Sequence, residues 1–418
     1  MTNSKHVPKR RFKEFESDGE WEQNQLKELA EFSKGRGYSK SELQTDGQPI
    51  ILYGRLYTKY ETVISTVDTF THIKENSVLS KGGEVLVPSS GESAEDIARA
   101  SVVAEEGIII GGDLNIIKLC KKIEPIFLSL AISNGKQKEE ISKRAQGKSV
   151  VHVNNDDLKQ VNVLFPSISE QIQIGKFFQT IDALISNHQH KLDKLKNLKK
   201  AYLSEMFPAE GERVPKRRFP GFEGEWEQKR LATIASMHAR IGWQNLRTSE
   251  FLNDGDYYLI TGTDFLDGRI NFDNCYYVDK ERYQQDKNIQ VKTGSILITK
   301  DGTIGKVAIV GHLDKPATLN AGVFNVVIKE SNVDEKYLYQ YLASPFLMDY
   351  VSKRVTGGTI KHLNQGILVD FPINIPTYEE QKAIGKFFEH LDQSITLQQQ
   401  KLDKLNDLKK AYLNELFV

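Results

Sequence analysis

Apolar residues recur at steps of three or four along two long stretches of the chain, residues 167–207 and 377–418. This spacing is typical of helices that carry one apolar stripe, and most other positions in both stretches are polar or charged. After a proline, each stretch begins with a capping-box pattern, Ser167 to Glu170 and Thr377 to Glu380, whose hydroxyl accepts a backbone N–H. The stripes comprise Ile174, Phe178, Ile181, Ile185, Leu192, Leu195 and Leu198 in the first helix, and Ile384, Phe388, Leu391, Ile395, Leu402, Leu405 and Leu408 in the second.

The two helical stretches are copies of one another. Residues 170–207 match residues 380–417 without a gap, and residues 7–12 (VPKRRF) recur as residues 214–219, each followed by Gly-Glu-Trp-Glu-Gln. Such a repeat indicates that one unit is used twice. It divides the chain into a first repeat segment, two heads, two helices and a linker: residues 1–20, head one at 21–166, the helix at 167–207, the linker at 208–225, head two at 226–376 and the helix at 377–418.

A stripe on a charged helix of about 40 residues, roughly 60 Å long, needs a partner. We expect the other helix to be that partner, rather than the surface of the helix's own domain. Connection order then makes the pair antiparallel and predicts a dumbbell with a pseudo-twofold axis. Because residues 1–20 repeat residues 208–225, the end of the second helix continues, in repeat terms, into the first residues of the chain.

Short β-branched runs alternate with Gly- and Asp-rich turns in both heads, and one helical segment precedes each long helix. This pattern predicts an α+β fold for each head, while the order of the strands stays open. The fold class is therefore α+β, with two globular domains separated by a pair of long antiparallel helices.

The composition adds limits on the class of protein. The chain has 418 residues, of which 39% are hydrophobic and 27% charged, a globular mixture that excludes collagen-like and wholly disordered classes. No apolar run approaches the length of a membrane span, and two cysteines suggest a reducing compartment, so a cytoplasmic location is expected. The net charge of zero argues against a uniformly basic nucleic-acid binder but leaves local basic patches open.

Basic and aromatic residues cluster in Gly-containing loops at corresponding places in the two heads. Arginine, glutamine and asparagine suit base edges, lysine and threonine suit phosphates, and glycine lets backbone approach a phosphate chain. We predict DNA contacts there, with solvated loops as the alternative. The candidates are Lys34, Arg36, Tyr38, Lys40, Tyr53, Arg55, Tyr57 and Lys59 in head one, and Arg240, Trp243, Gln244, Asn245, Arg247, Lys300, Thr303 and Lys306 in head two.

Two further loops lie at the junctions between each head and its long helix, and both combine basic residues with glycine. This suits contact with phosphates, and the alternative is an exposed helix end. The junction candidates are Lys143, Arg144 and Lys148 in the first copy, and Lys353, Arg354, Thr359, Lys361 and His362 in the second.

Motifs of catalysis are not found in the sequence. Gly147-Lys148-Ser149 resembles the end of a phosphate-binding loop, but position 142 is serine where that motif needs glycine. The cysteines and histidines lack zinc spacing, and Glu380-x-Lys382, a spacing seen in some nucleases, lies in the first turn of a helix. No metal site or catalytic residue is predicted.

Two variable heads, each followed by a helix that begins Pro-x-x-x-Glu-Gln-x-x-Ile, resemble the specificity subunit of type I restriction–modification enzymes, the HsdS family. The matching residues are Pro166, Glu170, Gln171 and Ile174 in the first copy and Pro376, Glu380, Gln381 and Ile384 in the second. Residues 358–362 (GTIKH) resemble the family's loop before the helix, whereas Ser149 has no close match to Gly358.

The resemblance implies that the heads are target-recognition domains, that each recognises half of a bipartite double-stranded DNA site, and that the helix pair sets the spacer. It further implies two methyltransferase subunits and two restriction subunits as partners. Those partners would carry out adenine methylation and cleavage with S-adenosylmethionine, ATP and Mg²⁺, and this chain would bind no cofactor and catalyse nothing by itself. A stand-alone methyltransferase, or a coiled-coil DNA-binding or scaffold protein outside restriction–modification, are the alternatives.

Overall fold

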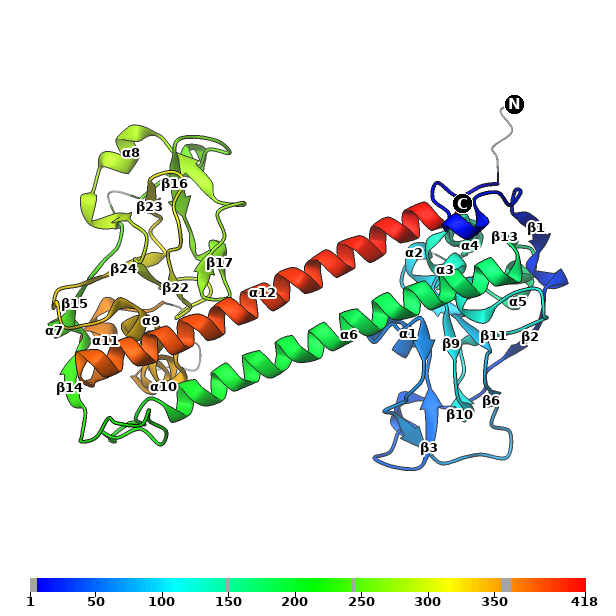
Figure 1. The fold of residues 1–418 in the computed structure, drawn as a ribbon, viewed down its shortest axis with the longest axis horizontal. Coiled ribbons are helices and arrows are strands. Elements are labelled where there is room, and N and C mark those ends of the chain that lie inside the picture. The colour runs from blue at the N-terminus through cyan, green and yellow to red at the C-terminus, as the bar shows by residue number, and fades with distance from the viewer. Residues whose placement is uncertain (1–5, 148–149, 243–244, 355–361) are drawn as a thin grey trace. The chain divides into compact units, whose positions relative to one another are not determined.

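The computed structural model describes residues 6–147, 150–242, 245–354 and 362–418 (Figure 1). It divides into two compact units: unit 1 is Met1–Gln189 with Gln400–Val418, and unit 2 is His190–Gln399. Two long helices, α6 (Ile168–Glu205) and α12 (Tyr378–Leu416), each contribute one part to each unit. The two predicted helices are therefore confirmed, with ends that differ by one or two residues.

Head one, in unit 1, is an α+β domain as predicted. Its larger sheets have the strand orders β2-β11-β7-β9-β4 and β5-β3-β10-β6, and β1 pairs with β13 and β8 with β12. The strands are β1 (Glu22–Gln25), β2 (Ala30–Lys34), β3 (Gln48–Ile51), β4 (Val63–Ile64), β5 (Phe70–Thr71), β6 (Leu79–Lys81), β7 (Val85–Pro88), β8 (Ser90–Gly91), β9 (Ser101–Val103), β10 (Glu106–Ile110), β11 (Leu114–Leu119), β12 (Val151–His152) and β13 (Asn162–Phe165). The helices are α1 (Arg55–Thr58), α2 (Ala94–Ile97), α3 (Pro125–Asn134), α4 (Lys136–Arg144) and α5 (Asn155–Lys159).

Head two, in unit 2, is also α+β. Its sheets have the orders β15-β24-β21-β22-β18-β17 and β19-β16-β23-β20, and β14 pairs with β25. The strands are β14 (Glu227–Arg230), β15 (Ala235–His238), β16 (Tyr257–Ile260), β17 (Phe265–Leu266), β18 (Arg269–Ile270), β19 (Tyr276–Val278), β20 (Gln290–Val291), β21 (Ile296–Thr299), β22 (Val307–Ile309), β23 (Ala317–Leu319), β24 (Val323–Ile328) and β25 (Pro372–Ile375). The helices are α7 (Leu231–Ile234), α8 (Lys280–Gln284), α9 (Glu335–Ala343), α10 (Pro345–Arg354) and α11 (Gln365–Val369).

In unit 1 the start of α6 packs antiparallel against the end of α12. The rings of Phe177 and Tyr412 meet edge to face with centroids 4.9 Å apart, and Phe178 lies 6.2 Å from Phe417. Trp21 and Phe127 of head one join the same buried cluster, so burial of these large aromatic rings ties the head to both helices.

Unit 2 repeats this cluster with the helices exchanged. Tyr202 near the end of α6 meets Phe387 near the start of α12 at 5.1 Å, and Phe207 stacks on Phe388 at 5.9 Å. The predicted antiparallel pairing therefore holds within each unit. All twelve predicted spacer residues, Ile174 to Leu195 in α6 and Ile384 to Leu405 in α12, are buried or half-buried.

The predicted apolar stripe is interrupted at one position in each helix. Leu198 and Leu408, at matching positions of the two helices, have 43% and 44% of their surface exposed. Further along the stripe the side chains are covered again, at Tyr202 and Met206 in the first copy and at Tyr412 and Leu416 in the second. No helix in the described ranges is long and apolar enough to cross a membrane.

The segment before head one and the linker before head two occupy equivalent places. The backbone N–H of Arg10 donates to the carbonyl of Glu415 at the end of α12, and that of Arg217 donates to the carbonyl of Glu205 at the end of α6 (Figure 1). Both bonds are 2.9 Å long. Arg10 therefore meets the end of α12 as Arg217 meets the end of α6, and the predicted continuation into residues 1–5 lies outside the described residues.

The repeated glutamates at the starts of α6 and α12 form ion pairs with arginines of the segment before head one and of the linker before head two. Glu170 accepts two hydrogen bonds from Arg11, at 2.8 and 2.6 Å, and Glu380 accepts two from Arg218, both at 2.7 Å. Both carboxylates are buried, so the ion pairs are desolvated. The predicted capping boxes are therefore only partly right. The side chain of each glutamate binds an arginine instead of reaching back to the start of its helix. In the second copy Oγ1 of Thr377 does accept the N–H of Glu380, at 3.4 Å.

Candidate nucleic-acid interface

The two heads share one frame of backbone hydrogen bonds around their loops. In head one, Ser89 donates to the carbonyl of Asp113 and accepts from Val153, at 2.8 and 3.1 Å. In head two, Lys300 donates to the carbonyl of Gly322 and accepts from Leu363, both at 2.8 Å. The turns that follow Ser89 and Lys300 therefore sit at matching places, although their sequences differ.

The junction histidines, repeated in sequence, contact these same turns. In head one the Oγ atom of Ser90 lies 3.3 Å from Nδ1 of His152. In head two, His362 pairs through Nδ1 with the carboxylate of Asp301. Repetition of the histidine was visible in the sequence, but its partners were not, because the turn residues differ between the heads.

In head one, a hollow of about 1220 Å³ brings the two predicted basic and aromatic segments together. Both segments contribute to its wall, although they are separated by the strand β3. The predicted residues that line it are Tyr38, Lys40, Tyr53, Arg55, Tyr57 and Lys59. Lys34 and Arg36 lie on the adjoining loop and are exposed.

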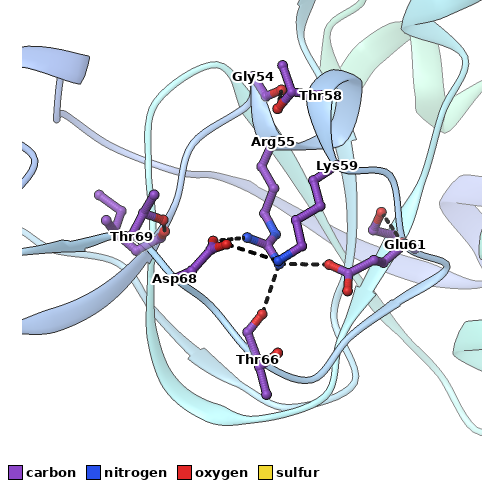
Figure 2. Close-up of polar contacts among 10 residues, drawn as sticks. Gly54, Arg55, Thr58, Lys59, Glu61, Thr66, Asp68 and Thr69 are labelled. Atoms are coloured by element: carbon purple, nitrogen blue, oxygen red, sulfur yellow. Dashed lines mark hydrogen bonds and ion pairs between the residues drawn. The ribbon is translucent and has the colours of Figure 1, made fainter. Parts of the chain in front are cut away.

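Arg55 lies in this wall but is not free to contact a base (Figure 2). Its side chain is 7% exposed, and its guanidinium donates to Asp68 at 2.6 Å, to Glu61 at 2.7 Å and to the carbonyl of Thr66 at 2.9 Å. The prediction of Arg55 as a base contact is therefore corrected: two carboxylates and a carbonyl occupy its terminal nitrogens. Lys59 likewise binds Asp68, at 2.9 Å.

The tyrosines of the hollow differ in exposure. Tyr57 donates to the carbonyl of Ser90 at 2.8 Å, and burial raises the pKa of its hydroxyl. Tyr38 has a positive φ of 62°, and its hydroxyl donates to the carbonyl of His72 at 3.1 Å. Tyr53 is 40% exposed and packs edge to face on Tyr57, so it offers the most accessible ring.

In head two, Arg240 is also buried, with 2% of its surface exposed. Its Nε donates to the carbonyl of Leu319 at 3.0 Å, and Nη1 donates to Oε1 of Gln285 at 3.0 Å. Burial lowers the pKa of Arg240, as desolvation disfavours the charged form. The base contact predicted for Arg240 is corrected for this reason.

The rest of that loop divides into exposed residues and residues outside the described ranges. Asn245 and Arg247 are exposed, and the backbone N–H of Arg247 is bound by Glu250 at 2.7 Å, which leaves the guanidinium on the surface. Trp243 and Gln244 lie outside the described residues. Asn245 and Arg247 are therefore exposed polar residues of the predicted loop.

The second predicted turn of head two carries exposed groups on a well-bonded backbone. Thr303 and Lys306 are exposed. Across the turn, the backbone N–H of Thr299 donates to the carbonyl of Lys306 at 2.9 Å, and the N–H of Lys306 donates to Oγ1 of Thr299 at 3.0 Å. The ammonium group of Lys300 is half-buried over the ring of Phe324, at 5.5 Å from its centroid.

At the junctions, most basic groups already contact an acidic residue or a ring. Arg144 pairs with Glu140 at 3.0 Å, and the exposed Lys143 lies 3.9 Å from Glu139. In the second copy, Lys353 pairs with Glu210, while Arg354 lies over the ring of Tyr350. The remaining junction candidates, Lys148, Thr359 and Lys361, lie outside the described residues.

The Glu-Gln pair at the start of each long helix is structural. Gln171 donates to the carbonyls of Lys122 and Pro166, at 3.1 and 2.9 Å, and accepts from the N–H of Glu124. Gln381 makes the same three bonds in unit 2, to Asn332, Pro376 and Asp334. Since Glu380 is fully buried against Arg218, the Glu-x-Lys spacing forms no nuclease centre. Within the described ranges no group of three or more acidic, histidine or cysteine side chains is placed to hold a metal ion.

Two α+β heads on one frame, each followed by a long helix, define a class of paired recognition proteins. Residues 18–197 and residues 223–407 both match the model of the type I restriction modification DNA specificity domain. The chain belongs to this family. With two copies of the domain, it is a specificity subunit of a type I restriction–modification system and not one of its catalytic subunits.

Relatives and solved structures agree along nearly the whole chain. The type I restriction enzyme MjaVIII specificity subunit of Methanocaldococcus jannaschii is 21% identical over 406 residues, which cover 95% of this chain and 92% of that protein. The putative MjaX specificity subunit of the same organism is 24% identical over 415 residues, with the same coverage. The crystal structure of the S subunit from M. genitalium has a TM-score of 0.65 at 16% identity and covers 99% of both chains, which shows the shared fold.

Proposed function

We propose that each head recognises one half of a bipartite site in double-stranded DNA and that the pair α6 and α12 sets the spacer between the halves. The observation that supports this proposal is that the two heads share one frame of backbone hydrogen bonds but differ in their loops. Turns at matching places present Ser90 in head one and Asp301 in head two. Two recognition surfaces of common origin and different chemistry suit a site with two unlike halves. One turn of DNA is about 34–36 Å, so a helix pair of up to about 60 Å suits halves one to two turns apart.

Several exposed residues are the proposed DNA contacts. Arginine and asparagine suit base edges, tyrosine offers an apolar face, and lysine and threonine suit phosphates. They are Lys34, Arg36, Lys40 and Tyr53 in head one, Asn245, Arg247, Thr303 and Lys306 in head two, and Lys143, Lys353 and Arg354 at the junctions. Lys148, Trp243, Gln244, Thr359 and Lys361 stay predictions.

The chemistry belongs, in this proposal, to partner subunits. Two methyltransferase subunits would modify adenine with S-adenosylmethionine, and two restriction subunits would cleave with ATP and Mg²⁺, while this chain binds none of these. The exposed, repeated Leu198 and Leu408 are apolar positions on the helices that a partner helix could cover.

A matched pair of heptad insertions tests the spacer. Seven helical residues inserted after Gln189 in α6, with seven after Gln399 in α12, preserve the apolar repeat and lengthen the pair by about 10 Å. At 3.4 Å per base pair we expect the spacer of the methylated site to grow by about three base pairs. The readout is single-molecule methylation sequencing of DNA from cells that co-express the cognate methyltransferase subunit.

The control carries seven residues between Asp273 and Asn274, both exposed in a turn of head two. It should methylate the original site with the original spacer. If the helix variant methylates with an unchanged spacer, the helices do not act as the ruler. If the wild-type complex methylates no bipartite site at all, the proposed function itself is wrong.

A further inference from the structure

Asp68, an acidic residue that the sequence pattern does not mark, lies in the wall of the head-one hollow. Its carboxylate points toward Arg55 and Lys59 (Figure 2). DNA phosphates repel carboxylates, so an exposed aspartate on a DNA-binding surface calls for an explanation. Among the residues that the structure describes, the charged groups that line the hollow are the cations Lys40, Arg55 and Lys59 and the acids Asp68, Glu92 and Asp113. The described lining thus carries as many acids as cations, which does not suit a row of phosphates.

Both oxygens of Asp68 are held in place by neighbouring cations. Oδ1 accepts from Nη1 of Arg55 at 2.6 Å, and Oδ2 accepts from Nζ of Lys59 at 2.9 Å. The hydrogen bond from Lys59 and the one from Arg55 lower the pKa of Asp68 to about 2. The carboxylate is therefore fixed in orientation and stays ionised at physiological pH.

Asp68 is more than a counter-ion for the buried Arg55. Glu61 already pairs with that guanidinium at 2.7 Å and is 33% exposed, whereas the Asp68 side chain is 63% exposed. An ionised carboxylate has roughly four lone-pair sites, of which the two cations and the backbone N–H of Asp68 itself use three. The remaining acceptor capacity faces solvent at the hollow.

The groups of DNA that can satisfy such an acceptor are the exocyclic amino groups of the bases. Adenine and cytosine present one in the major groove and guanine one in the minor groove, while phosphates and the keto oxygens of the bases are themselves acceptors. Leu43 and Leu52 line the same hollow and offer apolar contact beside the acceptor.

We propose that Asp68 is a specificity-determining residue of head one, a carboxylate held by Arg55 and Lys59 that accepts a hydrogen bond from the amino group of one base. Arg55 is then a positioning residue, which acts through Asp68. This inference rests on the proposed function, because it assumes that head one recognises half of the site.

The decisive variant is Asp68→Asn, which keeps the shape of the side chain and replaces one acceptor oxygen with a donor. At one base pair of one half-site, discrimination in favour of the amino-bearing base should fall by roughly 5- to 150-fold, and bases with a keto oxygen at that edge should be accepted. The other half-site and the spacer should stay unchanged. The readout is the sequence preference of methylation in cells that co-express the methyltransferase subunit.

Two further variants separate this role from a structural one. Asp156→Asn is the matched control, since Asp156 is also an exposed aspartate of head one, paired with Lys159 at 2.8 Å, and it does not line the hollow. It should leave the preference intact. Lys59→Met removes one of the two cations that hold the carboxylate, so discrimination at that base pair should weaken less than in Asp68→Asn, and the same base should still be preferred.

The amino group is assigned to a groove with oligonucleotides in which inosine replaces guanine. Inosine lacks the minor-groove amino group of guanine. If the affinity of the complex for DNA falls when inosine replaces guanine, and at no other replacement, Asp68 contacts the minor groove. Asp68 is not a specificity residue if Asp68→Asn leaves every position of the site unchanged, if it weakens methylation equally at all sequences, or if Lys59→Met rather than Asp68→Asn changes the preferred base. In each of these cases, methylation of a bipartite site by the wild-type complex would still support the proposed function.

Discussion

Head one and head two have the same frame and different loops, and the difference separates residues that hold the fold from residues that meet a ligand. The Trp21 and Trp226 clusters, the arginine–glutamate pairs and the glutamine bonds at the helix starts recur almost atom for atom. The turns after Ser89 and Lys300 keep their backbone bonds and change their side chains. In a duplicated chain, internal repetition therefore marks structure, and divergence on a repeated frame marks recognition.

Basic loop residues show the limit of that rule. Arg36, in the loop after β2 of head one, is exposed. Arg240, in the loop after the matching strand β15 of head two, is buried inside that head. An arginine at a similar position thus lies on the surface of one head and in the interior of the other.

The largest effect is expected where the two units are most alike. Glu170→Gln and Glu380→Gln each remove the buried carboxylate that pairs with Arg11 or Arg218, whose side chains are 7% and 15% exposed. Breaking such a pair costs about 3–5 kcal/mol. Hydrogen exchange followed by mass spectrometry on the full chain should show faster exchange in unit 1 for the first variant and in unit 2 for the second.

The control for this pair is Glu415→Gln, which breaks the bond to Arg10 on the surface, where the side chains are 55% and 37% exposed. It should change stability by less than about 1 kcal/mol. Equal exchange in both units after Glu170→Gln would show that the units do not respond separately to their own ion pairs.

The next effect contrasts the two loop arginines. Arg240→Ala removes the side-chain donor to the carbonyl of Leu319 and leaves Oε1 of Gln285 with only the 3.3 Å bond from Arg282, at a cost of about 1–3 kcal/mol to the stability of head two. Arg36→Ala, on the surface, should stay within about 0.5 kcal/mol of wild type and should reduce DNA binding instead. Denaturant unfolding and DNA titration of the same variants check both. If the Arg240→Ala chain is as stable as wild type but loses its sequence preference, Arg240 contacts a base after all.

Sequence reasoning predicted the repeat, the two helices and their pairing, because a periodic stripe and an ungapped copy are properties of the sequence itself. It placed Arg55 and Arg240 wrongly, since a Gly-rich basic loop has the same composition whether its arginine points outward or inward. Asp68 was missed for a related reason: its partners Arg55 and Lys59 are 13 and nine residues away, and nothing in the spacing shows that the chain turns back between them.

Arg247→Ala sharpens the contrast between heads at the level of recognition. A bidentate arginine contact contributes about 1–3 kcal/mol of discrimination, so one base pair of one half-site should lose roughly 5- to 150-fold preference. The half-site affected must be the one that Asp68→Asn leaves intact, because the two residues lie in different heads. Methylation sequencing of both variants checks this, and a uniform loss at all sequences would reassign Arg247 to a phosphate.

The smallest effect concerns the ion pairs between α6 and α12. In unit 1, Asp182 pairs with Lys409 at 2.5 Å, and in unit 2 the matching Asp392 pairs with Lys199 at 2.6 Å. The unit 2 pair is the more buried, at 17% exposure for both side chains against 31% and 22%, and Asp392 also accepts from Gln340 at 2.7 Å. We expect Asp392→Asn to destabilise the chain by about 1 kcal/mol and Asp182→Asn by less, because solvent screens the more exposed pair.

A double-mutant cycle with the lysine partners isolates each pair, and the coupling in unit 1 should fall further at high salt than the coupling in unit 2. Equal coupling and equal salt dependence would mean that burial does not distinguish the two pairs. In that case the difference between the units would be confined to the loops of the heads, and the helix pair would be symmetric in energy as well as in sequence.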